Sequence, residues 1–500
     1  MQIYNTQTHR KEELVPREAG KVAMYGCGPT VYNYIHIGNA RTFLTFDVVR
    51  RYLAWRGYEV TFVQNITDVD DKIINRAAEE GKTPAEIATF YTDAFIDAMH
   101  RFGIEDPDVR PRATEEIPAM IELVQLLIDK GHAYEVDGDV YFSVRSFADY
   151  GKLSGRNIDE MESGHRELRA DGQGMEDRKR DPLDFAVWKA AKPGEPHWSS
   201  PWGEGRPGWH LECSAMAEKY LGLPLDIHGG GADLVFPHHE NEVAQSEAAY
   251  GQTFAKYWLH GGMLNIINSE TGEEEKMSKS LGNFLLLTDV LDQCNPMALR
   301  LLMLQTHYRS PLAFSDERLK EAESSFERVR TAVRNLSWAA DNAAAAPETD
   351  TAALAALVGD TRERFVEAMD DDFNTAGALG AVFSLVGTAN SFLEENQQLS
   401  EDGRAAARTA AGAIEELLGV LGIVFDAERE WPAETCALAA DIAGYAGSDA
   451  HEAVDALLAA RAKARANKDW ALADAVRDGL TGLGFTVEDT AMGARVSYGA

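Results

Sequence analysis

Two cysteines, one histidine and one glutamate could together bind a metal ion. His238 and Glu242 lie four residues apart in FPHHENE, so a helix would place both side chains on one face. A neutral imidazole and a carboxylate on one face can ligate zinc, and Cys27 and Cys213 would complete four donors. This set requires distant segments to converge. Otherwise the helix face is simply solvated, and each cysteine is a small buried apolar residue.

A glycine-containing loop near the start of the chain could bind phosphate. Lys21–Gly26 is apolar and predicts a buried strand, Gly28 lies in the following loop, and HIGN at 36–39 opens a helix that runs through 41–55. A helix N-terminus attracts anions through its N–H groups and its dipole. Cys27 lies at the carboxyl end of the strand, where open α/β sheets bind ligands. The alternative is an ordinary strand–turn–helix with a buried cysteine.

A third candidate is the polar segment KMSKS, residues 276–280. Lys276 and Lys279, with two serine hydroxyls between and beside them, suit the clamping of a polyphosphate in a transition state. The alternative is a solvated lysine-rich turn.

The elements that must position these residues follow a βαβ pattern. A second strand is expected at 58–66, and strand, helix, strand predicts a parallel sheet. Helices at 73–80 and 84–102 would cover this sheet. The second half is predicted to contain a helix at 209–221, a strand at 225–228, a tight loop at 229–231, a helix at 236–250 and a strand at 256–264.

Between these halves lies an expected insertion, with a helix at 118–130, a hairpin at 132–144 turning at Asp137-Gly138, and a loop at 157–181. The predicted fold is therefore α/β: a Rossmann-like doubly wound parallel sheet split by an insertion and followed by an α-helical C-terminal half. The expected domains are a split catalytic domain (1–117 and 206–290), the insertion (118–205), a stem-contact linker (291–318), a helical bundle (319–425), a linker (426–450) and a small C-terminal domain (451–500).

Composition narrows the class of protein. The 500 residues carry a net charge of −33, which argues against nonspecific binding to nucleic acid. Four dispersed cysteines indicate a reduced, cytoplasmic chain rather than a disulfide framework. The first 13 residues are polar, and no apolar run reaches the roughly 18 residues that a membrane span needs. We therefore expect no signal peptide and no membrane association.

One C-terminal window is less acidic than the rest of the chain. Residues 451–480 hold five basic and five acidic side chains, whereas the average charge density predicts a net charge of about −2. Arg461, Arg465 and Lys468 are expected to share a helix face, and Trp470 could stack on a base. The alternative is an ordinary solvated face.

HIGN and KMSKS, in this order around a split βαβ fold, resemble the signatures of class I aminoacyl-tRNA synthetases. The finer resemblance is to the cysteinyl-tRNA synthetase family. It is carried by YGCGPTVYNYIHIGN at 25–39, NITDVDDKI at 65–73, GWHLECSAM at 208–216, DIHGGGADLVFPHHENE at 226–242 and KMSKSLGNF at 276–284, and by the C-terminal segments at 369–379 and 460–474.

The resemblance implies an enzyme that activates L-cysteine with ATP and Mg²⁺ and transfers it to the 3′-terminal adenosine of tRNA(Cys). It implies one Zn²⁺ per chain, held by Cys27, Cys213, His238 and Glu242, that selects the cysteine thiolate. His36, Asn39, Lys276 and Lys279 would be catalytic, and the ATP site would comprise His36, Asn39, Gly230, Asp233 and Lys279. The cysteine pocket would contain Thr30, Thr67, Trp209 and His228. Contacts with tRNA are expected from Arg461, Arg465, Lys468 and Trp470.

One residue departs from the family pattern. Asn39 stands where many relatives have a second histidine, and an amide can donate a hydrogen bond to phosphate but cannot carry positive charge. Two other functions remain open: a ligase that joins cysteine to an amino sugar, and a zinc-stabilised RNA-binding protein without enzymatic activity. The long segment after residue 295 argues against the first, since a small acceptor needs no such extension, and His36 with KMSKS argues against the second. We expect a monomer.

Overall fold

The computed structural model describes the chain except residues 159–177, 269–270, 278–282, 426–430, 491–492 and 499–500. It divides into two compact units. The first comprises Met1–Glu327, Arg362–Val382 and Leu417–Ile423, and the second comprises Arg328–Thr361, Phe383–Glu416 and Val424–Ala500. Every candidate ATP, cysteine and metal residue in the described part of the chain belongs to the first unit.

A four-stranded parallel sheet lies at the centre of the first unit. Its order is β11 (Ala255–Gly261), β10 (Leu225–Gly231), β3 (Lys21–Gly26) and β4 (Glu59–Gln64). The two central strands come from the two halves of the chain, and His228 pairs with Tyr25 across them. This arrangement confirms the predicted split Rossmann-like sheet and brings the loop after β3 beside the end of β10.

Side chains alternate between the two faces of β3. Ala23, Tyr25 and Cys27 belong to a buried cluster shared with Leu211 and Cys213 of α6 (Trp209–Leu221). Gly26 faces the other way, toward Phe46 of α1 (Ile37–Trp55). The period-two alternation of a strand thus directs Cys27 toward the helix that carries the second cysteine.

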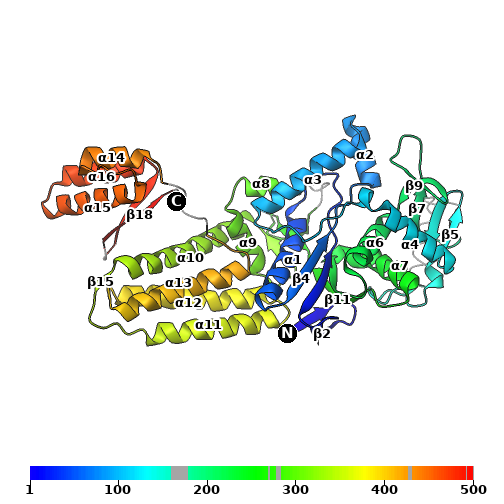
Figure 1. Ribbon diagram of the computed structural model, residues 1–500, viewed down its shortest axis with the longest axis horizontal. Coiled ribbons are helices and arrows are strands. Elements are labelled where there is room, and N and C mark those ends of the chain that lie inside the picture. Colours follow the sequence, from blue (N-terminus) through cyan, green and yellow to red (C-terminus); the bar gives the residue numbers. More distant parts are fainter. Residues whose placement is uncertain (159–177, 269–270, 278–282, 426–430, 491–492, 499–500) are drawn as a thin grey trace. The chain divides into compact units, whose positions relative to one another are not determined.

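Helices cover both faces of this sheet (Figure 1). On one side, α1 packs against β4, β10 and β11. On the other, α6 packs against α4 (Ile117–Asp129) and α7 (Glu240–Tyr250). The two helices that follow β4 in the chain are α2 (Asp71–Glu80) and α3 (Pro84–Arg101), and they pack on each other.

The glycine run 229–231 is not the loop that its sequence suggests. All three glycines continue β10 and pair with Leu259–Gly261 of β11. A Cβ atom on Gly229 would lie 1.8 Å from the carbonyl oxygen of Leu259, so close backbone approach is the reason for glycine here. The prediction of a tight loop at 229–231 was wrong.

The helix expected at 236–250 is also interrupted. Val235–His239 forms a separate turn, with Phe236 in an extended conformation (φ −140°, ψ 132°), and the regular helix α7 begins only at Glu240. His238 and Glu242 therefore lie on two helical segments that join at residues 239–240, rather than on one uninterrupted helix.

The insertion forms an antiparallel sheet in the order β5 (Ala133–Val136), β6 (Asp139–Phe142), β7 (Phe185–Ala190), β9 (Gly203–Pro207) and β8 (Trp198–Ser200). The predicted hairpin is β5–β6, and Asp137 and Gly138 both have positive φ in its turn. Val140, Phe142 and Trp188 pack into the same core as α4 and α6. Most of the loop expected at 157–181 lies outside the described residues.

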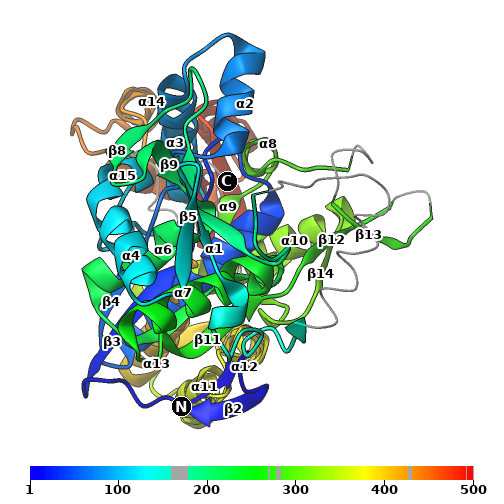
Figure 2. The same ribbon diagram turned by 90° about the vertical axis from the view of Figure 1, so that its right-hand side faces the viewer.

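Two smaller sheets complete the first unit. β1 (Gln2–Asn5) pairs with β2 (Arg10–Glu13). A second small sheet, to one side of the parallel sheet in Figure 2, has the order β13 (Glu274–Lys276), β12 (Leu264–Ile267) and β14 (Leu312–Phe314). Helices α8 (Leu287–Leu291) and α9 (Pro296–Leu304) lie between β13 and β14 in the chain.

The C-terminal half is helical, as predicted. It contains α10 (Asp316–Asn342), α11 (Ala352–Asp370), α12 (Thr375–Glu395) and α13 (Glu401–Val420), with a short pair β15 (Ala344–Ala345) and β16 (Gln398–Leu399). In the described chain, α12 alone is long and apolar enough to cross a membrane, with a mean hydropathy of 1.4. Half of that stretch is buried inside the protein, as in a core helix, so this is weak evidence for a span.

The C-terminal segment has its own small core. The predicted helical pair is α15 (Ala450–Ala466) and α16 (Trp470–Gly482), followed by the hairpin β17 (Phe485–Thr490) and β18 (Gly493–Tyr498). α14 (Glu434–Ala443) packs against α15 through Ala439. The segment 426–450, expected to be an aperiodic linker, therefore contributes a helix to this core.

Candidate functional site

A cavity of about 350 Å³ opens at the carboxyl edge of the parallel sheet. Its lining residues come from the loop after β3, the start of α1, the ends of β10 and β11 and the segment around β13. Seven residues proposed from the sequence line it, namely Cys27, Thr30, His36, Asn39, Trp209, Asp233 and Lys276. The same cavity thus borders both the N-terminus of α1 and Cys27.

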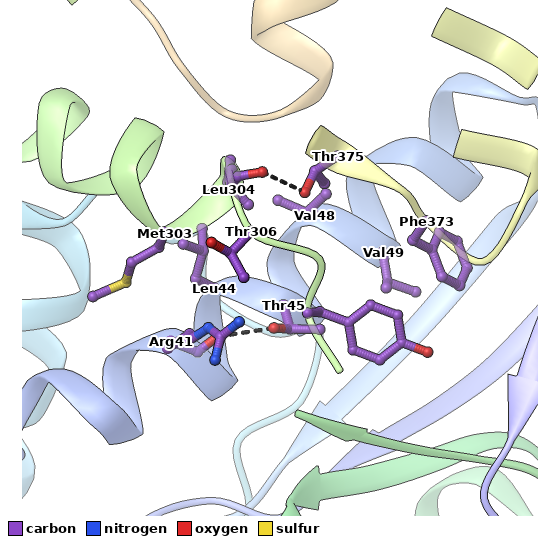
Figure 3. A pocket seen from close by; sticks show the side chains of 11 residues that line it. Arg41, Leu44, Thr45, Val48, Val49, Met303, Leu304, Thr306, Phe373 and Thr375 are labelled. Carbon is purple, nitrogen blue, oxygen red and sulfur yellow. Dashed lines mark hydrogen bonds between the residues drawn. The ribbon is translucent and has the colours of Figure 1, made fainter. Parts of the chain in front are cut away.

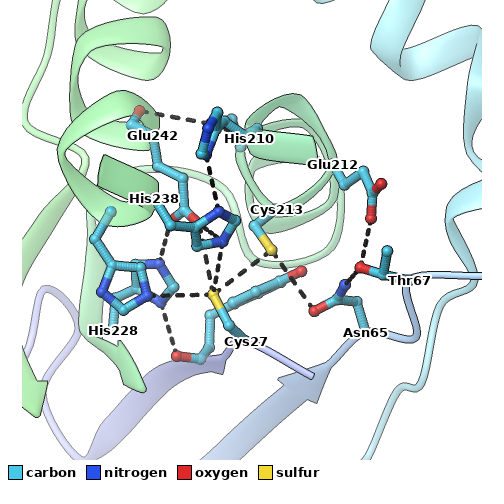
Figure 4. Close-up of polar contacts among 12 residues, drawn as sticks. Cys27, Asn65, Thr67, His210, Glu212, Cys213, His228, His238 and Glu242 are labelled. Atoms are coloured by element: carbon cyan, nitrogen blue, oxygen red, sulfur yellow. Dashed lines mark hydrogen bonds and ion pairs between the residues drawn. The ribbon is translucent and has the colours of Figure 1, made fainter. Parts of the chain in front are cut away.

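The four proposed metal ligands converge at the buried end of this cavity (Figure 4). The Cys27 sulfur lies 3.6 Å from the Cys213 sulfur, 3.4 Å from His238 Nε2 and 3.4 Å from Glu242 Oε1. In tetrahedral zinc sites, metal–ligand bonds of 2.0–2.3 Å place neighbouring donors about 3.3–3.8 Å apart. His238 Nε2 and Glu242 Oε1 are only 2.6 Å apart and would separate around a metal.

Sequence analysis missed a further donor, His239. Its Nε2 atom lies 3.3 Å from the Cys27 sulfur, and its donor atom forms a compact buried group with those of Cys27, His238 and Glu242. On its other side, Nδ1 of His239 lies 2.7 Å from Nε2 of His260. The adjacent histidines in FPHHENE were visible in the sequence, but a regular helix would have directed His239 away from the site.

Burial and mutual contacts shift the titration of the cluster. Burial raises the pKa of the Cys27 thiol well above its usual value. Burial would also raise that of Cys213, but hydrogen bonds to Cys27 and His238 outweigh it and lower its pKa to about 7. For Glu242, burial is overcome by His238 and His228, which hold its pKa well below the usual range. Buried thiols, imidazoles and a carboxylate of this kind form a donor set that a soft divalent cation would satisfy.

Two residues expected in the cysteine pocket lie behind the cavity surface. His228 is fully buried; it forms an ion pair with Glu242, and its Nδ1 lies 2.9 Å from the carbonyl oxygen of Tyr25. Thr67 donates a hydrogen bond of 2.6 Å to Glu212, whose pKa burial raises well above its usual value. Both side chains support residues that border the site, and neither is part of the cavity lining.

Two reciprocal hydrogen bonds between His36 and Asn39 cap the N-terminus of α1. The N–H of Asn39 donates to Nδ1 of His36, and the N–H of His36 donates to Oδ1 of Asn39, both at 3.3 Å. Because Nδ1 accepts a backbone N–H, the imidazole proton is on Nε2. The asparagine that departs from the family pattern thus serves as the third residue of a capping box.

The chain that follows KMSKS, at residues 285–287, is hydrogen-bonded to the start of α1. The N–H of Ile37 donates to the carbonyl of Leu285, and the N–H of Leu287 donates to the carbonyl of Ile35. Lys276 ends β13, and both Lys276 and Met277 line the cavity. Lys279 lies outside the described residues.

Arg41 holds the far wall of the cavity in place. It is 3% exposed, and its guanidinium donates to the carbonyls of Gly262 (3.0 Å), Met263 (3.1 Å), His307 (3.1 Å) and Ser310 (2.7 Å). Figure 3 shows Arg41 beside Thr45 of the same helix, at one end of an apolar void of about 10 Å³.

We expect Arg41→Met to weaken binding of ATP, the nucleotide that the sequence resemblance implies. The change leaves four carbonyls without their donor, so the free energy of unfolding should fall by about 3 kcal/mol, and the loop at 262–263 should lose its position. Kinetics of adenylate formation should show a raised KM for ATP and an unchanged KM for cysteine. Arg50→Met is the matched control, since buried Arg50 on the same helix bonds Glu105 and the carbonyl of Asp106 instead. It should destabilise the protein without changing KM for ATP, and an equal rise in both variants would contradict this role.

The residues proposed to bind tRNA have unlike environments. Arg461 is 6% exposed and makes a two-point ion pair with Asp489 of β17, and exposed Arg465 shares that carboxylate. Lys468 lies beyond the end of α15 and has a positive φ of 60°. The prediction that it shares a helix face with the two arginines was therefore wrong. Trp470 is 59% exposed at the start of α16. The structure thus gives Arg461 a packing role, and leaves Arg465, Lys468 and Trp470 accessible.

Arg461→Gln and Arg465→Gln should therefore behave differently. The first removes a buried guanidinium that pairs with half-exposed Asp489 and should lower the thermal midpoint of the C-terminal segment. The second should leave that midpoint nearly unchanged, because exposed pairs contribute at most ~1 kcal/mol, and should reduce the slope of log Kd for tRNA against log salt by about one. Calorimetry and salt-dependent binding titrations would measure both. A lower slope for Arg461→Gln without loss of stability would contradict the packing role.

Comparisons with known proteins agree with the geometry. Residues 13–324 match the family model described as "tRNA synthetases class I (C) catalytic domain", residues 364–426 match the DALR domain, and residues 448–496 match the "Cysteinyl-tRNA ligase anticodon binding domain". The chain is 49% identical to the cysteine–tRNA ligase of Desulforamulus reducens over 99% of both chains. It is 48% identical to that of Geobacillus thermodenitrificans over 100% of this chain and 99% of the relative.

Among solved structures, the chain is similar to a methionyl-tRNA synthetase of Mycobacterium tuberculosis in complex with methionyl-adenylate. The TM-score is 0.59 at 19% identity, over 80% of this chain and 90% of that one, which supports the fold. Together with the full-length identities, these matches show that the chain belongs to the cysteine–tRNA ligase family of the class I aminoacyl-tRNA synthetases.

Proposed function

We propose that the protein activates L-cysteine with ATP and transfers it to the 3′-terminal adenosine of tRNA(Cys). One observation carries this proposal. Cys27, part of a buried cluster of thiols, imidazoles and a carboxylate, borders the same cavity as His36 at the N-terminus of α1. A site that binds a thiol at one end and phosphate at the other suits an enzyme that joins cysteine to a nucleotide.

A zinc ion held by Cys27, Cys213, His238 and Glu242 would provide the selection for cysteine. The donor set fits, because the Cys27 sulfur lies within 3.6 Å of a donor atom of each of the other three. When bound, the metal supplies a soft Lewis acid that prefers a thiolate to a serine hydroxyl. His239 remains beside the set as a neutral imidazole, because burial lowers its pKa well below the usual value. His228 would hold Glu242 in its ligating position.

Phosphate binding is assigned to the start of α1 and to the KMSKS lysines. His36 would donate from Nε2, and Asn39 from its side-chain amide, toward the phosphates. Lys276, at the end of β13 on the cavity wall, and Lys279 would neutralise charge on the α-phosphate and the leaving pyrophosphate. Asp233, which also lines the cavity, is suited to accept hydrogen bonds from the ribose hydroxyls. Gly230, the other residue proposed for the ATP site, lies behind the lining, where a Cβ would meet Leu234 and His239.

The proposed reaction has two steps and uses no side chain as a nucleophile. The cysteine carboxylate attacks the α-phosphorus of ATP, and the bond to pyrophosphate breaks. The 2′-hydroxyl of the terminal adenosine then attacks the carbonyl carbon of the adenylate, and AMP leaves with its electron pair. Thr30 and Trp209 would orient the amino acid, with Thr67 behind them. Positioning and charge stabilisation therefore provide most of the rate.

Further partners are proposed on the same basis. Mg²⁺ would accompany ATP, and Arg465, Lys468 and Trp470 would contact tRNA, with Arg461 supporting them. We propose that the protein acts in the cytoplasm as a monomer. The alternative, a cysteine:amino-sugar ligase, is not favoured, since the relatives named cysteine–tRNA ligase match over the whole chain and an anticodon-binding model matches residues 448–496.

Two assays test the proposal. Cysteine-dependent exchange of pyrophosphate into ATP should occur without tRNA, and serine should not replace cysteine. Absence of exchange would favour an RNA-binding protein without enzymatic activity. Formation of cysteinyl-tRNA from tRNA(Cys) should then follow, whereas exchange with charging of an amino sugar in place of tRNA would establish the alternative.

A further inference from the structure

An exposed cluster of aromatic rings lies at the mouth of the cavity. Phe90 of α3 is 51% exposed, one of the few large apolar side chains on the described surface. Its ring centroid lies 6.1 Å from that of Tyr34 and 5.0 Å from that of Tyr91. Tyr34 also lines the cavity, so the cluster connects the outer surface with the interior of the site.

The rings pack against one another and have basic side chains beside them. The three rings meet nearly at right angles, between 78° and 88°, and the buried hydroxyl of Tyr91 accepts a hydrogen bond of 3.1 Å from Arg76. The ammonium of Lys82 lies 5.8 Å from the centroid of Phe90. That of Lys72, which lines the cavity, lies 5.4 Å from the centroid of Tyr32. Glu80 pairs with both Lys82 and Arg76, and Glu79 also pairs with Arg76.

Flat rings beside lysines are the usual surface for unpaired nucleic acid. Bases stack on aromatic side chains regardless of sequence, and nearby cations follow the phosphates. Preordered rings lose little conformational freedom when a base stacks on them.

We propose that Phe90 and Tyr34, flanked by Lys72 and Lys82, form a stacking platform for the unpaired 3′-terminal nucleotides of tRNA. The platform guides the terminal adenosine into the cavity, where its hydroxyl reaches the activated amino acid. The identity of the RNA rests on the proposed function. The stacking itself rests on the geometry of the rings.

Substitutions of Phe90 test the platform, since Phe90 is outside the cavity lining. Phe90→Leu keeps an apolar side chain but removes the flat ring, whereas Phe90→Tyr keeps the ring. We expect kcat/KM for tRNA to fall about ten-fold in Phe90→Leu and to stay near the wild-type value in Phe90→Tyr. Pyrophosphate exchange should be unchanged in both. Thr89→Ala, at the exposed neighbouring position on α3, is the matched control and should change neither activity.

Binding measurements separate stacking from other effects. With intact tRNA, Phe90→Leu should bind about ten-fold more weakly than wild type. With tRNA that lacks its unpaired 3′-terminal nucleotides, the two proteins should bind equally. Phe90→Trp adds a spectroscopic readout: intact tRNA should quench its extra fluorescence relative to Phe90→Tyr, and truncated tRNA should not.

The outcomes are decisive in either direction. Equal binding of wild type and Phe90→Leu to intact tRNA, or a defect that persists with truncated tRNA, would overturn the platform. If wild type fails to exchange pyrophosphate with cysteine, the proposed function fails instead. The comparison of intact with truncated RNA would still decide whether the rings stack on unpaired nucleotides.

Discussion

Cys213→Ser should lose bound zinc and cysteine activation together. The Cys213 sulfur lies 3.6 Å from that of Cys27, fully enclosed by α6 and the loop after β3, and its lowered pKa of about 7 favours the thiolate that binds metal. A serine hydroxyl is a poor ligand for zinc at this pH. Supporting residues around metal sites typically control affinity by 10- to 100-fold, so loss of a direct ligand should exceed about 100-fold in kcat/KM for cysteine.

Metal content and pyrophosphate exchange should be measured on the same preparations. Cys436→Ser is the matched control: Cys436 is a half-buried thiol of α14 in the second unit, and its replacement should leave one zinc per chain and normal exchange. If Cys213→Ser retained zinc and full activity, Cys27, His238, His239 and Glu242 would be the better ligand set.

Arg300→Met should be the most destabilising change away from the cavity. Arg300 of α9 is fully buried and forms an ion pair with Asp47 of α1, while it also donates to the carbonyls of Leu421 (2.8 Å) and Gly103 (3.0 Å). Removing one partner of a buried pair typically costs 3–5 kcal/mol. Asp47 keeps its ion pair with Arg51, but the carbonyls of Leu421 and Gly103 also lose the donor that Arg300 provides. We expect a loss of about 4 kcal/mol, measured by denaturant unfolding.

The pH dependence of this loss follows from Asp47. Burial would raise the pKa of its carboxyl, but Arg300 and Arg51 outweigh burial and lower it. The stabilisation is therefore complete above the unfolded pKa of about 3.9 and disappears as the pH falls through the lowered folded value. The difference between wild type and Arg300→Met should be constant near neutrality and shrink below about pH 4. Arg408→Met, which breaks an exposed pair with Asp341, should cost less than ~1 kcal/mol at any pH.

Periodicity predicted the regular elements well. The strand at Lys21–Gly26, the helix after HIGN and the β5–β6 hairpin follow from apolar spacing and turn residues. Glycine was misread at 229–231, because a sequence shows that glycine is present but not whether a turn or a neighbouring backbone requires it. The convergence of Cys27 on Cys213 followed only from the assumption that both halves share one sheet.

Other features could not be predicted from side-chain patterns. Arg41 binds four carbonyls from two segments more than 200 residues away, and carbonyls leave no signature in a sequence. His239 reaches the cluster because the chain bends at Phe236, which a regular helical projection does not include. Arg461 carries the charge expected of an RNA contact, but it pairs with Asp489 instead. Asp489 comes within reach only when the β17–β18 hairpin has folded.

Two glycines of the cavity lining, Gly28 and Gly262, cannot accept a side chain, and this restricts how the enzyme can evolve under an inhibitor. A methyl group on Gly28 would lie 1.6 Å from the carbonyl oxygen of Asn65, and one on Gly262 would lie 2.6 Å from those of Arg309 and Ser310. Because rigid backbone cannot yield as a flexible side chain does, resistance mutations at these positions should destroy the fold together with drug binding. A compound that contacts these backbone positions would therefore leave few tolerated substitutions that weaken its binding.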